Sequence, residues 1–128
     1  AKLTEVDLSR ADLTESVLKN AQIKNSFLTG ADIRNANLEN INLEESDLSG
    51  AKLAKTNFKR ANLKGANLHR SDLEHADLSR ADLSQANLSG TKLIDANFSN
   101  AILDDADFSG ADITDTNFSD ATGLKKKD

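Results

Sequence analysis

The carboxylates and the two histidines are the residues of this sequence that could take part in acid–base or metal chemistry. The 128 residues include 21 Asp and Glu and two His, His69 and His75, but no Cys. The lack of Cys excludes a thiol nucleophile, a disulfide framework and a thiolate metal site. A carboxylate or an imidazole becomes a catalyst or a metal ligand only when the fold places partners around it. The chemistry therefore depends on the elements that position these side chains.

Those elements are a tandem repeat of five residues. Cut from Ala1, the chain reads AKLTE, VDLSR, ADLTE and continues in one frame to TNFSD at Asp120, which makes 24 pentads without insertion or deletion. The third residue is Leu, Phe or Ile in all 24, the first is Ala, Ser or Thr in 22, and the second is Asp or Asn in 17. The repeat is expected to form one unit over 1–120, with 121–128 as a short C-terminal cap or tail.

A five-residue period fits neither an α-helix nor an ordinary strand. Residues five apart are rotated by about 500° on an α-helix, so the Leu side chains would spiral around it. A strand alternates with period two, which five does not match. The pattern predicts a coil in which each pentad forms a short extended side and a turn. The first and third residues then point inward, and four pentads close a square.

The pattern A-[DN]-L-x-x, found throughout this frame, resembles the pentapeptide repeat family. The resemblance covers Ala1 to Asp120 and implies an all-β fold, a right-handed quadrilateral parallel β-helix (a solenoid) with four pentads per coil. About six coils of 20 residues would use all the pentads. Stacking at the strand spacing of about 4.8 Å would give a rod roughly 25–30 Å long. Residues 20 apart are then expected to lie above one another.

The corners of the coil are expected at the fourth and fifth residues of each pentad. A type II turn needs a positive φ at the fifth residue, which favours Gly or Asn. Only ten pentads have either there, and others have residues such as Arg10 or Glu45, so type I turns are expected to outnumber type II. Ile41 is too large for its first position and predicts a local bulge or shift. Four first-position hydroxyls are expected to find backbone acceptors; they belong to Ser16, Ser26, Ser46 and Ser71.

One outer column of mixed charge is the main candidate interaction surface. It contains, in order, Asp12, Asp32, Lys52, Asp72, Lys92 and Asp112. The interleaved Lys residues are expected to relieve repulsion and fix register, although each exposed pair contributes only about 0–1 kcal/mol. The face formed by 11–15 and every fourth pentad after it, called face 3 below, has four basic and eight acidic residues, net −4. Faces 1, 2 and 4, which start at 1–5, 6–10 and 16–20, have net charges of −3, −1 and +1.

Phe27 is the other candidate contact. It stands at a second position, where Asp or Asn is usual, and so should point outward, as should Val17 and Ile102. Val17 and Phe27 are expected to form a small apolar spot near the N-terminal end. Inside the rod, Phe98 is expected to stack on Phe118, with Phe108 on another face.

The C-terminal end departs from the repeat. A solenoid exposes its core at its ends unless they are capped. Gly123 takes the place of the core Leu, and Leu124, one residue late, is expected to fold back over the last coil. Lys125–Lys127 would then act as a charged guard against end-to-end stacking.

The sequence favours a protein without enzymatic activity, cofactor or metal. Every outer carboxylate is expected to be solvated and to lack the perturbed pKa that catalysis needs, and a smooth rod should offer no concave pocket. His69 and His75 fall at outward positions on different faces, where an exposed structural role is expected. No apolar run approaches the roughly 18 residues of a membrane span. The net charge of −5 argues against direct nucleic-acid binding.

Two functions follow from these interpretations. The first is a structural or interaction module that binds a protein partner of unknown identity, as a monomer or a weak end-to-end dimer. The resemblance implies a bacterial, often cyanobacterial, or plastid source. It also implies a soluble location, cytoplasmic or exported to a periplasm or thylakoid lumen after removal of a leader.

The alternative is DNA mimicry. Some members of the family resemble duplex DNA, bind DNA gyrase, and inhibit it or protect it from quinolones; an acidic face replaces phosphate contacts. Interruption of the charge by Lys, the lack of a projecting loop and the lack of a C-terminal dimerisation helix count against it.

Overall fold

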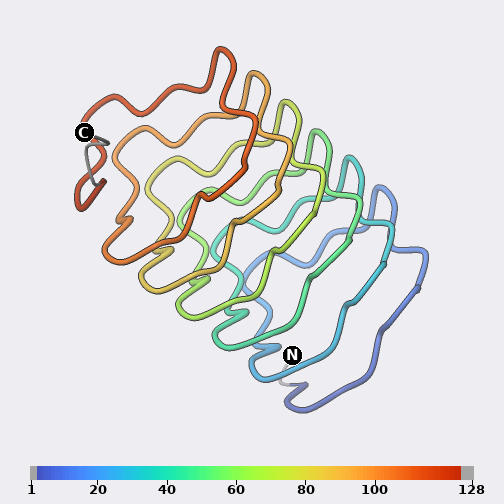
Figure 1. The fold of residues 1–128 in the computed structure, drawn as a ribbon. Coiled ribbons are helices and arrows are strands. Elements are labelled where there is room, and N and C mark those ends of the chain that lie inside the picture. Colours follow the sequence, from blue (N-terminus) through green and yellow to red (C-terminus); the bar gives the residue numbers. More distant parts are fainter. Residues whose placement is uncertain (1–2, 125–128) are drawn as a thin grey trace.

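The computed structural model describes residues 3–124 as one stack of coils, with the first and the last described coils at opposite ends of the stack (Figure 1). In nearly every pentad the second residue forms a single parallel β-bridge with the residue 20 positions on, from Asp7–Phe27 to Ile102–Thr122. The fourth and fifth residues form a turn, as expected. Within this part of the chain there is no helix and no strand longer than one bridge.

The same set of backbone hydrogen bonds holds most pentads of the coil. In the pentad 26–30, Phe27 N–H donates to the Val6 carbonyl of the coil before at 2.9 Å, and Leu28 N–H donates to the Asp47 carbonyl of the coil after at 2.7 Å. Parallel pairing every 20 residues, with a corner every five, confirms the expected right-handed quadrilateral parallel β-helix. The expected number of six coils stays a prediction.

The core consists of the first and third residues of the pentads. From Ala21 to Leu103 nearly all of them are buried, whereas the third residues of the first and last coils are partly or fully exposed. The Phe98 and Phe118 rings stack as expected, with centroids 5.4 Å apart and planes 25° apart. Phe108 comes from another side of the square, and its ring meets both of the others edge-on, at 6.0 and 5.8 Å.

The expectation that type I turns predominate is wrong. The φ angle is positive at the fifth residue of every pentad, including non-glycine residues such as Arg10 (62°) and Glu45 (60°). Ala11 N–H donates to the Leu8 carbonyl at 3.0 Å, which makes Arg10 the i+2 residue of the turn. A positive φ at i+2 alone is the pattern of a type II turn. The physical reason is hydrogen bonding between coils, because in this conformation the Arg10 N–H donates to the Thr29 carbonyl of the next coil at 2.9 Å.

The bulge expected at Ile41 is also absent. The Ile41 side chain is buried, and the bridges Gln22–Asn42 and Asn42–Asn62 continue past it without interruption. The residues 20 positions before and after it are both Ala, so the small neighbours in the column compensate for the larger side chain.

The first-position hydroxyls behave in two ways. The Ser26 hydroxyl donates to the Lys24 carbonyl at 3.3 Å, and the Ser46 hydroxyl donates to the Ile23 carbonyl at 3.0 Å. The hydroxyls of Ser16 and Ser71 are buried without a hydrogen-bond partner, so for these two the expectation is wrong.

Residues 3–124 contain no helix that is long and apolar enough to cross a lipid bilayer.

Candidate interaction surfaces

The second-position carboxylates of face 3 are fixed by their own corners. Asp12 Oδ1 accepts hydrogen bonds from the Thr14 backbone N–H at 3.1 Å and from the Thr14 hydroxyl at 2.8 Å. Asp112 makes the same pair of bonds with Thr114, at 3.1 and 2.6 Å. Each carboxylate thus closes an Asx turn onto the residue two positions on.

The same role explains why the second residue is so often Asp or Asn. Asn57 Oδ1 accepts the Lys59 N–H at 2.9 Å, as a carboxylate would, so the oxygen is needed and its charge is not. This use of the second residue was missed by the sequence reasoning. Its signal was present, because 17 of the 24 second positions carry one of these two residue types.

The structure brings the predicted column of face 3 together. Asp12 pairs with Asp32, Lys52 with Asp72, and the bridges continue to Asp112. The Asp32 carboxylate forms a bidentate pair with the Arg34 guanidinium, with oxygen–nitrogen distances of 2.7 and 2.8 Å. Within residues 3–124, neither Lys of the column lies within 4.0 Å of a carboxylate oxygen. Any relief of repulsion by these Lys residues therefore acts at longer range.

Hydrogen bonding favours the ionised form of Asp12, Asp32 and Asp112. The Thr14 hydroxyl and backbone N–H lower the pKa of Asp12, and Thr114 does the same for Asp112. The hydrogen bond from Arg34 is the largest cause of the lowered pKa of Asp32. A carboxyl group with a lowered pKa is a poor general acid at neutral pH, so the column presents fixed negative charge rather than acid–base chemistry.

Phe27 is exposed, as predicted, but it does not lie beside Val17. Its side chain is 53% exposed, and it pairs with Asp7 and Asp47 on face 2. Val17, 72% exposed, pairs with Asn37 on face 4. Ten residues make half a coil, so the two side chains point from opposite faces and the expected apolar spot does not form.

The two histidines make separate polar contacts. His69 Nδ1 lies 2.7 Å from the Ser89 hydroxyl oxygen, and His75 Nε2 lies 3.8 Å from an Asp95 carboxylate oxygen. No group of three or more His, Asp or Glu within residues 3–124 is placed to hold a metal ion.

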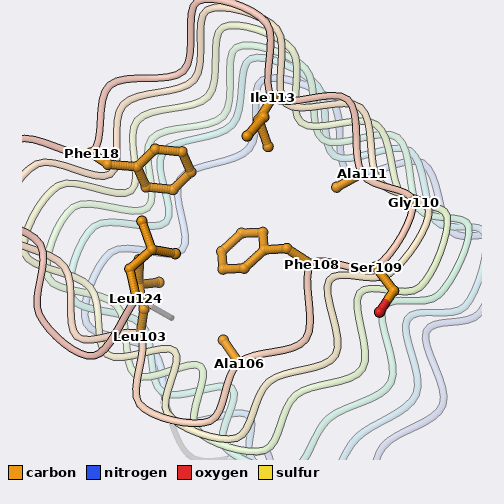
Figure 2. A pocket seen from close by; sticks show the side chains of 9 residues that line it. All are labelled: Leu103, Ala106, Phe108, Ser109, Gly110, Ala111, Ile113, Phe118 and Leu124. Atoms are coloured by element: carbon orange, nitrogen blue, oxygen red, sulfur yellow. The ribbon is translucent and has the colours of Figure 1, made fainter. Parts of the chain in front are cut away.

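The expectation of a rod without a concave pocket is wrong at the C-terminal end. A cavity of about 640 Å³ opens there, lined by Leu103, Phe108, Ile113, Phe118 and other residues of the last coils. Figure 2 shows these side chains pointing into the interior of the square, with Leu124 beside them. The cavity exists because no further coil covers these core positions within residues 3–124.

The segment after the last pentad partly closes this end. Thr122 continues the ladder, because its carbonyl accepts the Leu103 N–H at 2.8 Å. The chain then turns at Gly123, whose φ is 81° and where a Cβ would lie 2.6 Å from the Asp104 nitrogen. This turn lets Leu124 reach the cavity, as predicted. The predicted guard of Lys125–Lys127 lies outside the described residues.

Comparison with known proteins identifies the repeat. A family model described as pentapeptide repeats (8 copies) matches residues 1–40, 41–80 and 81–120. Among solved structures, a pentapeptide repeat protein from the thylakoid lumen of Arabidopsis thaliana is 27% identical, with 94% of this chain and 69% of that chain covered and a TM-score of 0.45. QnrB1, a plasmid-mediated fluoroquinolone resistance protein, is 18% identical, with coverage of 93% and 77% and a TM-score of 0.48. A pentapeptide repeat protein from Nostoc PCC 7120 is 35% identical, with coverage of 82% and 62% and a TM-score of 0.27. No curated protein matches the chain.

Proposed function

The chain belongs to the pentapeptide repeat family, and from that premise we propose that it is a non-enzymatic interaction module that binds a protein partner through face 3. The supporting observation is that the carboxylates of face 3 are already held in place. Asp12 and Asp112 stand at the two ends of the column. Thr14 holds the first and Thr114 holds the second, each by two hydrogen bonds. A side chain that is ordered before binding loses less entropy when a partner arrives.

The partner surface is one that carries Lys or Arg side chains. Face 3 has a net charge of −4, and charge complementarity raises association rates and selects partners. Asp12 and Asp112 are separated by five coil repeats, which corresponds to about 24 Å along the rod at the strand spacing. A basic strip of that length on a folded protein would meet the whole column.

The test is a pull-down from the source cell with two matched variants of the rod. One changes the four Asp of the column to Asn; the other changes four second-position Asp on other faces to Asn. The first set is Asp12, Asp32, Asp72 and Asp112, and the second is Asp7, Asp47, Asp77 and Asp82. Asn retains the acceptor that closes the corner, as Asn57 shows, so both variants should fold. A partner that is lost with the first variant and kept with the second supports the proposal; one that both variants retain overturns it.

DNA mimicry with DNA gyrase as the partner is the second candidate, and the observation in its favour is the excess of carboxylates on face 3. The pairing of Asp32 with Arg34 and the presence of Lys52 and Lys92 in the column reduce the likeness to a row of phosphates. A gyrase supercoiling assay tests it directly. If micromolar protein neither inhibits gyrase nor protects it from a quinolone, this candidate is removed.

A further inference from the structure

The C-terminal end of the rod combines an apolar cavity with an open backbone edge. Ile113 is a third-position residue, a class that is buried in the middle of the rod, yet it is 51% exposed and lines the cavity. Phe108 and Phe118 line the same cavity (Figure 2). Covering these three side chains would remove apolar surface from water, which favours association.

The edge of the last coil offers hydrogen-bond donors. In the body of the rod the N–H of each third residue donates to the next coil, as Leu88 does to the Asp107 carbonyl at 2.7 Å. The N–H groups of Phe108, Ile113 and Phe118 have no acceptor within residues 3–124. An extended segment laid across this end would supply carbonyls in the manner of strand addition.

The charged residues of the last full coil, 101–120, are all of one sign. Residues 101–120 contain no Lys or Arg and six acidic residues, which are Asp104, Asp105, Asp107, Asp112, Asp115 and Asp120. Such a rim attracts a segment that carries Lys or Arg and repels an acidic one.

The same rim disfavours a second copy of this chain as the occupant. If a second copy continued the ladder, its Asp7 would lie over Asp107 and its Asp12 over Asp112, because these residues share columns. Like charges directly opposite each other at about 4.8 Å are destabilising. Repulsion between like charges therefore opposes end-to-end stacking of two copies.

We propose that the C-terminal end of the rod is a docking site for an extended polypeptide segment in which Lys or Arg residues flank a large apolar side chain. The apolar side chain enters the cavity beside Ile113, the backbone pairs with the last coil, and the basic side chains meet the Asp rim. The chain itself carries a one-sided version of this pattern, because Leu124, which lines the cavity, is followed in sequence by three Lys residues. The site shares Asp112 with the column of face 3, but its test uses residues of other faces.

The probe is a fluorescein-labelled peptide in which pairs of lysines flank a Thr-Phe-Thr centre, titrated with the full chain at low ionic strength. Asp107→Asn with Asp120→Asn removes two rim charges on faces 2 and 4. Asn suits both sites, since Asp107 closes its corner by accepting the Ser109 N–H at 2.9 Å and Asp120 has a positive φ of 58°. The matched control is Asp7→Asn with Glu5→Asn, because Asp7 accepts the Ser9 N–H at 3.0 Å and Glu5 has a φ of 59° at the other end of the rod.

We expect the rim variant to weaken peptide binding about two- to thirtyfold, because it removes two exposed charge pairs, and the control to leave it unchanged. A peptide with Ser in place of Phe should bind more weakly than the probe. Equal weakening by both variants, or equal binding of the Phe and Ser peptides, would overturn the proposal. If the intact chain does not bind the probe, a variant with Lys125–Lys127 changed to Gln should bind it, because this variant carries three fewer positive charges to repel the basic peptide. No binding by either chain would also overturn the proposal.

Discussion

The Ser46 hydroxyl completes the corner that precedes Ser26 in the coil before it. Its oxygen accepts a hydrogen bond from the Ser26 N–H at 3.0 Å, and its O–H donates to the Ile23 carbonyl at 3.0 Å. In most corners these two backbone groups bond directly, as Ala31 N–H does to the Leu28 carbonyl at 3.0 Å. A buried side chain from one coil is therefore part of a turn in its neighbour, and the two coils share one hydrogen-bond network.

We expect Ser46→Ala to lower the free energy of unfolding by about 1–2 kcal/mol. The substitution leaves the Ser26 N–H and the Ile23 carbonyl buried without this partner, and such groups cost about that much. If the Ser26 N–H then bonded directly to the Ile23 carbonyl, the loss of stability would be smaller. Urea unfolding followed by circular dichroism measures the change, and an unaltered midpoint would mean that the hydroxyl contributes nothing net.

Ser71→Ala should have the opposite effect and raise the free energy of unfolding by about 1 kcal/mol. The Ser71 hydroxyl is buried and has no hydrogen-bond partner, so its removal ends a desolvation cost. The residue 20 positions earlier in the same column is Ala51, which shows that the site accepts a methyl group. A thermal melt should show a rise of about 4 °C. A lower melting temperature would contradict the unpaired state of this hydroxyl.

Much of the fold could be predicted from the sequence because one physical requirement repeats in every pentad. The 20-residue register, the inward first and third residues and the stacking of Phe98 on Phe118 all follow from closing a square with an apolar centre. The exposure of Phe27 follows from the same register. Its relation to Val17 was predicted wrongly, because nearness in sequence was given more weight than the half coil between them.

The conformation of each corner could not be predicted from its own residues, because the hydrogen bonds between coils impose one conformation on all corners. A positive φ at Arg10 or Glu45 costs roughly 1–3 kcal/mol for a non-glycine residue. The same conformation aligns the fifth-position N–H with the next coil, and a different turn would lose that bond and disturb the core on either side. The cavity at the C-terminal end was missed for a related reason, since the repeat describes a covered coil and Ile113 belongs to an uncovered one.

Glycine substitutions can measure the cost of the corner conformation. Gly50 has a φ of 66°, and a Cβ added there would meet no atom within 4 Å. Gly50→Ala should therefore lower the free energy of unfolding by about 1 kcal/mol through the backbone alone. Gln85, with a φ of 61°, offers the reverse experiment, and Gln85→Gly should raise it by about 0.5–1 kcal/mol. Chemical denaturation of the two variants gives both values, and changes of the same sign would show that φ is not the cause.

Stability should fall at acidic pH because the Asx turns prefer ionised carboxylates. The pKa of Asp7, Asp12, Asp107 and Asp112 is lowered in the folded chain from the ordinary value of 3.8. In each case the main cause is hydrogen bonding by the residue two positions on; these residues are Ser9, Thr14, Ser109 and Thr114. A lowered folded pKa gives a stabilising contribution that is fully present above the unfolded value and is lost as the pH falls through the folded value.

We therefore expect the free energy of unfolding to decrease as the pH falls from about 4 toward 2, and to decrease less in a variant with these four Asp changed to Asn. Asn keeps the oxygen that accepts the hydrogen bond, as Asn57 does, but it does not titrate. Urea unfolding at neutral pH and at about pH 3 measures the difference for both chains. At neutral pH the variant should remain folded with a similar midpoint, which separates loss of titration from loss of the turn. An equal decrease in the two chains would show that the acid sensitivity arises from other carboxylates, and that these four turns contribute through geometry alone.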